Sequence, residues 1–127
     1  MRCQFVPEAP LIGIVDDDDA VRELIGSLVR SVGFSTAVFS NAEAFLSSDY
    51  LNDAGYPILD VQLPRISGLD LQKHLEKTDR RIPIIFATAC GNDHVRKEAF
   101  DHGVVAFLDK PFGDETLLNA MRLALAQ

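Results

Sequence analysis

The stretch LIGIVDDDD, residues 11–19, places four consecutive aspartates directly behind a short apolar run. The run, residues 11–15, ends abruptly on both sides, which is typical of a buried β-strand. Gly33 stands where the helix that follows would end. Apolar residues between the aspartates and this glycine recur at three- and four-residue spacing, which predicts one apolar helix face made of Val21, Leu24, Ile25, Leu28, Val29 and Val32. The stretch therefore predicts a strand, a carboxylate-rich turn and a helix in succession.

The same alternation of apolar run and amphipathic stretch occurs five times along the chain. Further strands are predicted at residues 34–39, 57–59, 82–87 and 104–108. The third strand has the shortest apolar run, because residues 52–57 are polar and turn-prone. Pro57 suits the first residue of a strand better than the middle of a central one.

Four more amphipathic stretches predict the remaining helices. Residues 40–43 have the form of a capping box that begins at Ser40, and Ser67 and Asn92 are suited to cap the third and fourth helices. Gly103 would end the fourth helix. The residues expected on the inner faces are Ala42, Phe45 and Leu46, then Leu71 and Leu75, then Val95 and Ala99, and finally Leu117, Leu118, Met121, Ala124 and Leu125.

The fold class follows from this alternation. Strands that are apolar almost throughout, separated by helices, predict a parallel sheet with both faces covered. Right-handed crossovers then produce a doubly wound α/β sandwich of three layers, with five strands and five helices. A chain of 127 residues has the size of one domain.

Composition excludes several classes of function. The net charge of −7, from 19 acidic and 12 basic side chains, disfavours nucleic-acid binding by this chain, because such affinity comes largely from Lys and Arg on phosphates. No uncharged run approaches the roughly 20 apolar residues of a membrane helix, and residues 1–10 lack the apolar core of a secretory signal. The two cysteines, Cys3 and Cys90, form no metal-ligand or disulfide pattern and fit a reducing cytoplasm.

Polar residues follow each strand that should be central. In open parallel sheets ligands bind at the carboxyl ends of the strands. Converging carboxylates repel one another unless a cation lies between them, and oxygen-only ligands suit Mg²⁺ or Mn²⁺. A carboxylate can also attack phosphorus, while lysine and threonine can contact phosphoryl oxygens. The set predicts metal-assisted phosphoryl transfer onto the protein, and its members are Asp16, Asp17, Asp60, Thr88 and Lys110.

Each of these residues also has a simpler explanation. The aspartate run could cap the helix, Asp60 could be a turn residue, Thr88 could fill a strand, and Lys110 could solubilise a strand end. All of them are expected at one rim of the sheet, the edge formed by the carboxyl ends of the strands, and this coincidence favours a phosphoryl-transfer site over the separate simpler explanations. A phosphohydrolase of the haloacid-dehalogenase type would carry a second aspartate two residues after its nucleophile, where this chain has Gln62. A flavodoxin-like cofactor binder is disfavoured because four aspartates in its phosphate loop would repel the phosphate.

Four motifs together resemble a known family. IVDDDDAVR (14–22), LDVQLPRISGLDL (59–71), FATA (86–89) and FLDKPF (107–112) are similar to the receiver (CheY-like) domain of two-component response regulators, most of all to the FixJ-like class. The resemblance runs from about Leu11 to the last helix. It implies a flavodoxin-like sheet in the order 2-1-3-4-5, with residues 1–10 as a tail and 11–127 as the receiver domain.

The resemblance also implies roles for single residues. Asp60 would be the phosphoacceptor, and Asp17 would bind Mg²⁺ directly while Asp16 acts largely through water. The backbone carbonyl of Gln62 would be a further ligand. Thr88 and Lys110 would contact the phosphoryl group. Asp18 and Asp19 match no ligand position and are predicted to cap and start the first helix.

A switch and its partners are implied in the same way. Thr88 would move toward the phosphoryl group, and Phe107 would turn into the space it leaves. This would reshape the surface of the fourth helix, fifth strand and fifth helix, where a downstream protein binds or a homodimer forms on phosphorylation. The peptide bond between Lys110 and Pro111 would be cis.

The expected function is that of a phosphorylatable switch rather than a classical enzyme. A sensor histidine kinase or phosphotransfer protein would supply the phosphoryl group, and the chain would also catalyse its own Mg²⁺-dependent phosphorylation and dephosphorylation. One alternative is an interaction module that works without phosphate, and another is a receiver fragment of a DNA-binding transcriptional regulator.

Overall fold

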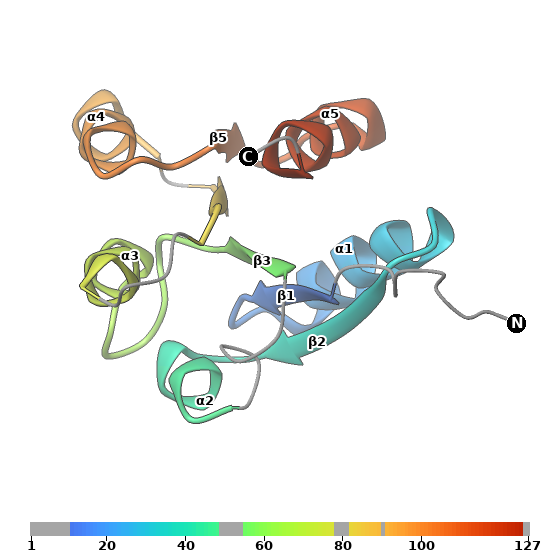
Figure 1. Ribbon diagram of the computed structural model, residues 1–127, viewed down its shortest axis with the longest axis horizontal. Helices are drawn as coiled ribbons and strands as arrows, with labels where there is room; N and C mark the ends of the chain where they lie inside the picture. The colour runs from blue at the N-terminus through green and yellow to red at the C-terminus, as the bar shows by residue number, and fades with distance from the viewer. Residues whose placement is uncertain (1–10, 49–54, 78–81, 90, 126–127) are drawn as a thin grey trace, which may run out of the picture.

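The computed structural model describes residues 11–48, 55–77, 82–89 and 91–125, in which parallel strands alternate with helices (Figure 1). The predicted tail, residues 1–10, and Cys90 lie outside this described part. The strands are β1 (Leu11–Val15), β2 (Ser35–Phe39), β3 (Gly55–Leu59), β4 (Ile85–Thr88) and β5 (Ala106–Asp109). The helices are α1 (Asp19–Ser31), α2 (Ala42–Leu46), α3 (Gly68–Glu76), α4 (Asp93–Asp101) and α5 (Asp114–Leu125). Among the described helices, none is long and apolar enough to cross a bilayer.

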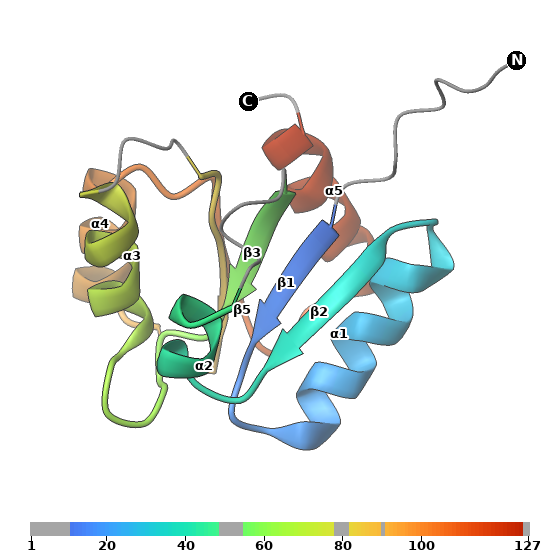
Figure 2. The same cartoon turned by 60° about the horizontal axis from the view of Figure 1, so that its bottom comes forward.

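The strand order is β2-β1-β3-β4-β5, which confirms the predicted doubly wound sheet. Helices α1 and α5 cover one face of this sheet, and α2, α3 and α4 cover the other (Figure 2). Successive residues of β1 point to opposite faces, so Ile12 and Ile14 pack with α1 and α5 while Val15 packs with the helices on the other side. Burial on both faces explains why the strands are apolar almost throughout.

The two faces hold separate hydrophobic clusters. The cluster on the α1/α5 face, called here the first cluster, includes Ile14, Ile25, Val29, Tyr56, Leu117 and Met121. The cluster on the α2/α3/α4 face, called here the second cluster, includes Val15, Phe45, Leu59, Leu71, Phe86, Ala99 and Phe107. The inner faces predicted for α2, α3, α4 and α5 are thereby confirmed for the side chains that the structure describes.

Strand β3 begins at Gly55, two residues before the predicted start. Tyr56 is only 2% exposed, and its hydroxyl donates a hydrogen bond of 3.4 Å to the Met121 carbonyl. Burial raises the pKa of Tyr56 to about 12, so this hydroxyl keeps its proton at neutral pH. A polar-looking segment thus supplies a core residue.

Pro57 lies inside this central strand, where proline is not expected. The Asp60 N–H donates to the Val15 carbonyl at 2.9 Å, so alternation along the strand directs the Pro57 nitrogen away from β1, toward β4. Pairing between β3 and β4 begins only at Ile58, opposite Ile85. The position therefore lacks a partner for an N–H group within the ladder, and proline removes no ladder bond there.

Three other strands differ from the prediction at their ends. Strand β2 starts at Ser35 rather than at residue 34, and β4 spans Ile85–Thr88 rather than 82–87. Strand β5 spans Ala106–Asp109 rather than 104–108. The apolar residues before β4 and β5 contribute to the core without ladder pairing, and a single bond of 2.9 Å runs from the Val105 N–H to the Ile84 carbonyl. Both strands also end one residue later than predicted, at Thr88 and Asp109, and these two residues pair in register.

Helix α1 begins as predicted, with Asp18 as its N-cap and Asp19 as its first residue. The Asp18 side chain accepts from the N–H groups of Ala20 and Val21. However, two of the residues predicted on the inner face of this helix, Leu24 and Val32, are exposed. Leu24 is 72% exposed because it lies about 100° around the helix from buried Ile25. Val32 is 44% exposed because it is the C-cap, beyond the last helical residue.

The other helix ends are set by capping. Asn41, not Ser40, caps α2, since its Oδ1 accepts from the Ala44 N–H at 2.7 Å. The predicted capping box at Ser40 is therefore wrong. Ser67 and Asn92 cap α3 and α4 as predicted. Gly33 and Gly103 have positive φ angles of 98° and 87° just after α1 and α4, a conformation that glycine adopts most readily.

Candidate functional site

Asp16 follows β1 directly and is almost fully buried, with 2% exposure. Its N–H donates to the Phe39 carbonyl of β2 at 3.1 Å, which extends the sheet by one residue. Its Oδ1 accepts from the Asp18 N–H at 2.9 Å, and its Oδ2 lies 2.6 Å from the Lys110 Nζ. Burial raises the pKa of Asp16, and the hydrogen bonds from Lys110 and Asp18 offset only part of that rise.

Asp60 follows β3 in the same way and is 8% exposed. Its Oδ1 accepts from the Gln62 N–H at 2.9 Å, and its Oδ2 lies 3.1 Å from the Lys110 Nζ. Gly68, the first residue of α3, packs onto the Asp60 backbone so closely that an added Cβ would lie 2.3 Å from the Asp60 carbonyl oxygen. The absence of a side chain at residue 68 lets α3 start directly against the strand end that presents Asp60.

Lys110 follows β5 and brings an ammonium group between two carboxylates. Its side chain is 16% exposed, and its own N–H donates to the Thr88 carbonyl at 2.9 Å. Burial lowers the pKa of Lys110, but the hydrogen bonds to Asp16 and Asp60 outweigh this effect, so the net shift is upward. The peptide bond from Lys110 to Pro111 is cis, as predicted.

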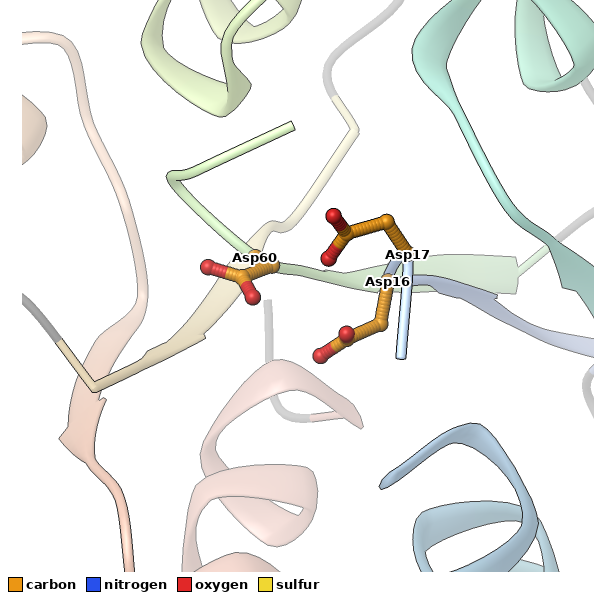
Figure 3. A group of neighbouring side chains, drawn as sticks. All are labelled: Asp16, Asp17 and Asp60. Atoms are coloured by element: carbon orange, nitrogen blue, oxygen red, sulfur yellow. The ribbon is translucent and has the colours of Figure 1, made fainter. Parts of the chain in front are cut away.

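Three carboxylates meet at this rim. Asp16, Asp17 and Asp60 each offer an oxygen, and these oxygens all lie within 4.8 Å of one another. Figure 3 shows the side chains of Asp16 and Asp17 extending from the end of β1 toward Asp60. One ammonium group cannot balance three carboxylates, so the site carries excess negative charge. An all-oxygen donor set with one exposed member, Asp17, fits a hard divalent cation that keeps part of its water shell.

Thr88 and Phe107 lie deeper, on β4 and β5. Thr88 is fully buried, and Phe107 is 6% exposed with its ring centre 6.0 Å from that of Phe86. The Arg96 guanidinium of α4 lies 4.7 Å above the Phe107 ring and reaches Asp109 at 2.7 Å. A Cβ on Gly91 would lie 2.4 Å from the Phe107 ring, so the buried ring occupies space that a side chain at residue 91 would fill.

The structure brings the predicted residues Asp16, Asp17, Asp60 and Lys110 into one cluster. The Thr88 carbonyl accepts a hydrogen bond from the Lys110 N–H beside this cluster, and Phe107 packs within the second cluster. Three residues that contact this site were not identified from the sequence. Arg22 contacts Asp16, and Gly91 and Arg96 lie against Phe107. Arg22 stands one turn beyond the N-cap of α1, within the motif that contains the aspartates, and this spacing is the one signal that could have drawn attention to it.

Comparisons with known proteins agree on one family. A family model described as the response regulator receiver domain matches residues 12–122. Response regulator protein TodT of Pseudomonas putida is 45% identical over 117 residues, which are 92% of this chain and 52% of TodT. Transcriptional regulatory protein FixJ of Azorhizobium caulinodans is 36% identical over 122 residues, which are 96% of this chain and 58% of FixJ. The chain thus spans about half the length of the curated relatives it matches.

Solved structures confirm the same fold. The structure named FixJ-N superposes with a TM-score of 0.85 at 30% identity, covering 93% of this chain and 94% of that one. Response regulator StyR superposes with a TM-score of 0.85 at 37% identity, covering 93% of this chain and 60% of that one. With its parallel sheet in the order 2-1-3-4-5 and its acidic rim, the chain belongs to the response regulator receiver family, whose standard function is phosphorelay signalling through phosphorylation of an aspartate.

Proposed function

We propose that Asp60 is the phosphoacceptor of this receiver and that the chain works as a phosphorylation-controlled switch. The observation that carries the proposal is the position of the Asp60 carboxylate, 3.1 Å from the Lys110 ammonium and within 4.8 Å of two further carboxylates. An Asp60 oxygen would form the new bond to phosphorus. The leaving group, an imidazole nitrogen of phosphohistidine or an acyl oxygen of a small donor, would take the electron pair of the broken bond.

The residues around Asp60 suit a bound magnesium ion. We infer that Asp17, Asp60 and the backbone carbonyl of Gln62 would hold Mg²⁺, or Mn²⁺, directly, with Asp16 acting largely through water. The ion would supply positive charge that relieves repulsion among the carboxylates and the incoming phosphoryl group.

The chain's own residues would orient the transferred group. The raised pKa of Lys110 keeps its ammonium charged at neutral pH, so it can donate to a phosphoryl oxygen from its place beside Asp60. The Thr88 hydroxyl would donate to another oxygen. Catalysis of this kind depends mostly on positioning and charge neutralisation, which residues fixed at strand ends can provide.

We propose that the switch then runs from Thr88 to Phe107 and reshapes the surface formed by α4, β5 and α5. That surface would bind a downstream protein or output domain, or a second copy of the chain once phosphorylated. The donor would be a sensor histidine kinase or phosphotransfer protein in the cytoplasm. The chain would also catalyse its own Mg²⁺-dependent phosphorylation and dephosphorylation, and residues 11–127 would form the receiver domain.

The decisive test is the intact mass of the chain after incubation with Mg²⁺ and a small acyl-phosphate donor. One added phosphoryl group, absent when the metal is chelated, is the expected result. No added mass, together with no binding of a beryllofluoride mimic, would overturn the proposal and favour an interaction module that works without phosphate. Binding of the mimic without added mass would instead support a short-lived acyl phosphate at the proposed site.

Magnesium is expected to stabilise the folded chain. At a free Mg²⁺ concentration tenfold above its dissociation constant, binding to the folded state alone adds about 1.4 kcal/mol. For a chain of this size that raises the thermal midpoint by roughly 5 °C. Thermal melts with Mg²⁺ and with a KCl control of equal ionic strength measure the shift. The Asp17→Asn variant changes an exposed ligand and no packing, so it should lose the shift, and an unchanged shift would contradict the ligand set.

A further inference from the structure

Arg22, in the first turns of α1, reaches back across the turn that joins β1 to α1. Its Nη1 donates to the backbone carbonyl of Asp16 at 2.6 Å, and its Nη2 contacts the Asp19 carboxylate. Its side chain is only 17% exposed, unusually low for an arginine beside a strand end. The guanidinium is therefore a fixed part of the turn that carries the acidic residues.

The hydrogen-bonded carbonyl has a particular place in the turn. It belongs to the peptide group between Asp16 and Asp17, whose plane also contains the Asp17 nitrogen and Cα, so holding this carbonyl holds the backbone position from which the Asp17 side chain extends. Asp16 is additionally held by burial and by bonds from Asp18 and Lys110. Asp17 is exposed, so its aim toward Asp60 depends on the backbone rather than on surrounding core.

Two effects of Arg22 on a metal ion have opposite signs. As a positive charge near the acidic rim, the guanidinium would repel a divalent cation and weaken its binding. As a clamp on the peptide group, it would hold Asp17 in place and strengthen binding. Because the guanidinium is paired with the Asp19 carboxylate, the pair has a net charge near zero, and we expect the clamp to be the larger of the two effects.

We propose that Arg22 is a positioning residue for the metal site, acting through the Asp16 carbonyl to keep the Asp17 carboxylate directed at Asp60. The inference rests on the proposed metal-binding function of these aspartates. Groups that orient metal ligands without touching the metal typically change metal affinity by 10–100-fold when they are removed. Arg22 would be such a group, supplied by α1 rather than by the strands.

The test is the Mg²⁺ dissociation constant of the chain and its variants, measured by titration calorimetry. Arg22→Met removes the charge and the donors but keeps an unbranched, helix-favouring side chain. We expect it to weaken Mg²⁺ binding about tenfold. Arg22→Lys keeps the charge but cannot span the Asp16 carbonyl and Asp19 together, so it should also bind Mg²⁺ more weakly than the parent. Arg30→Gln, on the same helix but paired with Glu23 and Thr36, is the matched control and should bind like the parent.

The outcomes separate the inference from the proposal on which it rests. A parent chain that binds no Mg²⁺ would overturn the metal site itself. If the parent binds Mg²⁺, Arg22→Met binds it equally or more tightly and Arg22→Lys binds it like the parent, the positioning role is overturned. Arg22 would then affect the site only through its charge. Thermal melts without metal accompany each titration. If Arg22→Met does not fold, the Arg22→Lys result alone decides, because an affinity equal to that of the parent contradicts the clamp.

Discussion

The Asp60→Asn variant is expected to incorporate no phosphoryl group under conditions in which the parent chain gains one. An amide lacks the anionic oxygen that attacks phosphorus, so the loss should be complete rather than partial. The fold should survive the change, because the asparagine Oδ1 can still accept from the Gln62 N–H and Lys110 keeps its 2.6 Å contact with Asp16. The readout is intact mass after incubation with Mg²⁺ and an acyl-phosphate donor.

The matched control for this variant is Asp109→Asn. Asp109 ends β5, is exposed and pairs with Arg96 at 2.7 Å, and it lies outside the group formed by Asp16, Asp17 and Asp60. We expect this variant to gain a phosphoryl group as the parent does. Labelling of Asp60→Asn at the parent's level would place the acceptor elsewhere, and peptide mapping would then have to choose between Asp16 and Asp17.

The Lys110→Met variant is expected to be less stable than the parent by about 3–5 kcal/mol near pH 7 without metal, the usual result of leaving a buried charge without its partner. The side chains of Asp16 and Asp60 are 3% and 10% exposed, so water cannot replace the lost ammonium fully. Urea denaturation measures the difference. The exposed pair of Lys97 and Asp101 offers a control, since Lys97→Met should change the free energy of unfolding by less than about 0.5 kcal/mol.

The loss of stability in Lys110→Met, measured as the decrease in the free energy of unfolding relative to the parent, should become smaller as pH falls. Lys110 lowers the pKa of Asp16 in the parent, so its removal raises that pKa further. A carboxyl whose pKa is higher in the folded than in the unfolded chain stabilises the fold at low pH and loses this effect as pH rises through the folded pKa. The deficit should therefore be largest near pH 7 and shrink as pH falls toward about 4. Mg²⁺ should recover part of it at pH 7, because the ion would replace the missing positive charge. A deficit that grows on acidification would contradict this account.

Strand β1 and the acidic cluster could be predicted because both depend on local pattern. Residues 11–15 are apolar and bounded, and polar groups at the carboxyl ends of parallel strands must meet at one rim. Strand β3 could not be delimited in this way. Whether Tyr56 is core and whether Pro57 removes a ladder bond depend on where β4 begins to pair, which is a relation between distant segments.

The contacts that Arg22, Gly91 and Arg96 make could not be predicted for a related reason, although the position of Arg22 one turn after the N-cap of α1 could have drawn attention to that residue. Each depends on how one side chain, or its absence, meets another element, and no periodicity in a single sequence reports that. The exposure of Leu24 shows the complementary error. Three- and four-residue spacing identifies the apolar face of α1 but not how many of its residues are buried, which depends on how the helix packs against the sheet.

The two hydrophobic clusters on opposite faces of the sheet have a mechanical consequence. Phe107 and the inner side of α4 belong to the second cluster, whereas Leu117 and Met121 of α5 belong to the first. If the proposed rearrangement around Phe107 takes place, we therefore expect it to displace α4 more than α5, which packs on the other face of the sheet. A partner that contacts both helices would then respond to the position of α4 relative to α5.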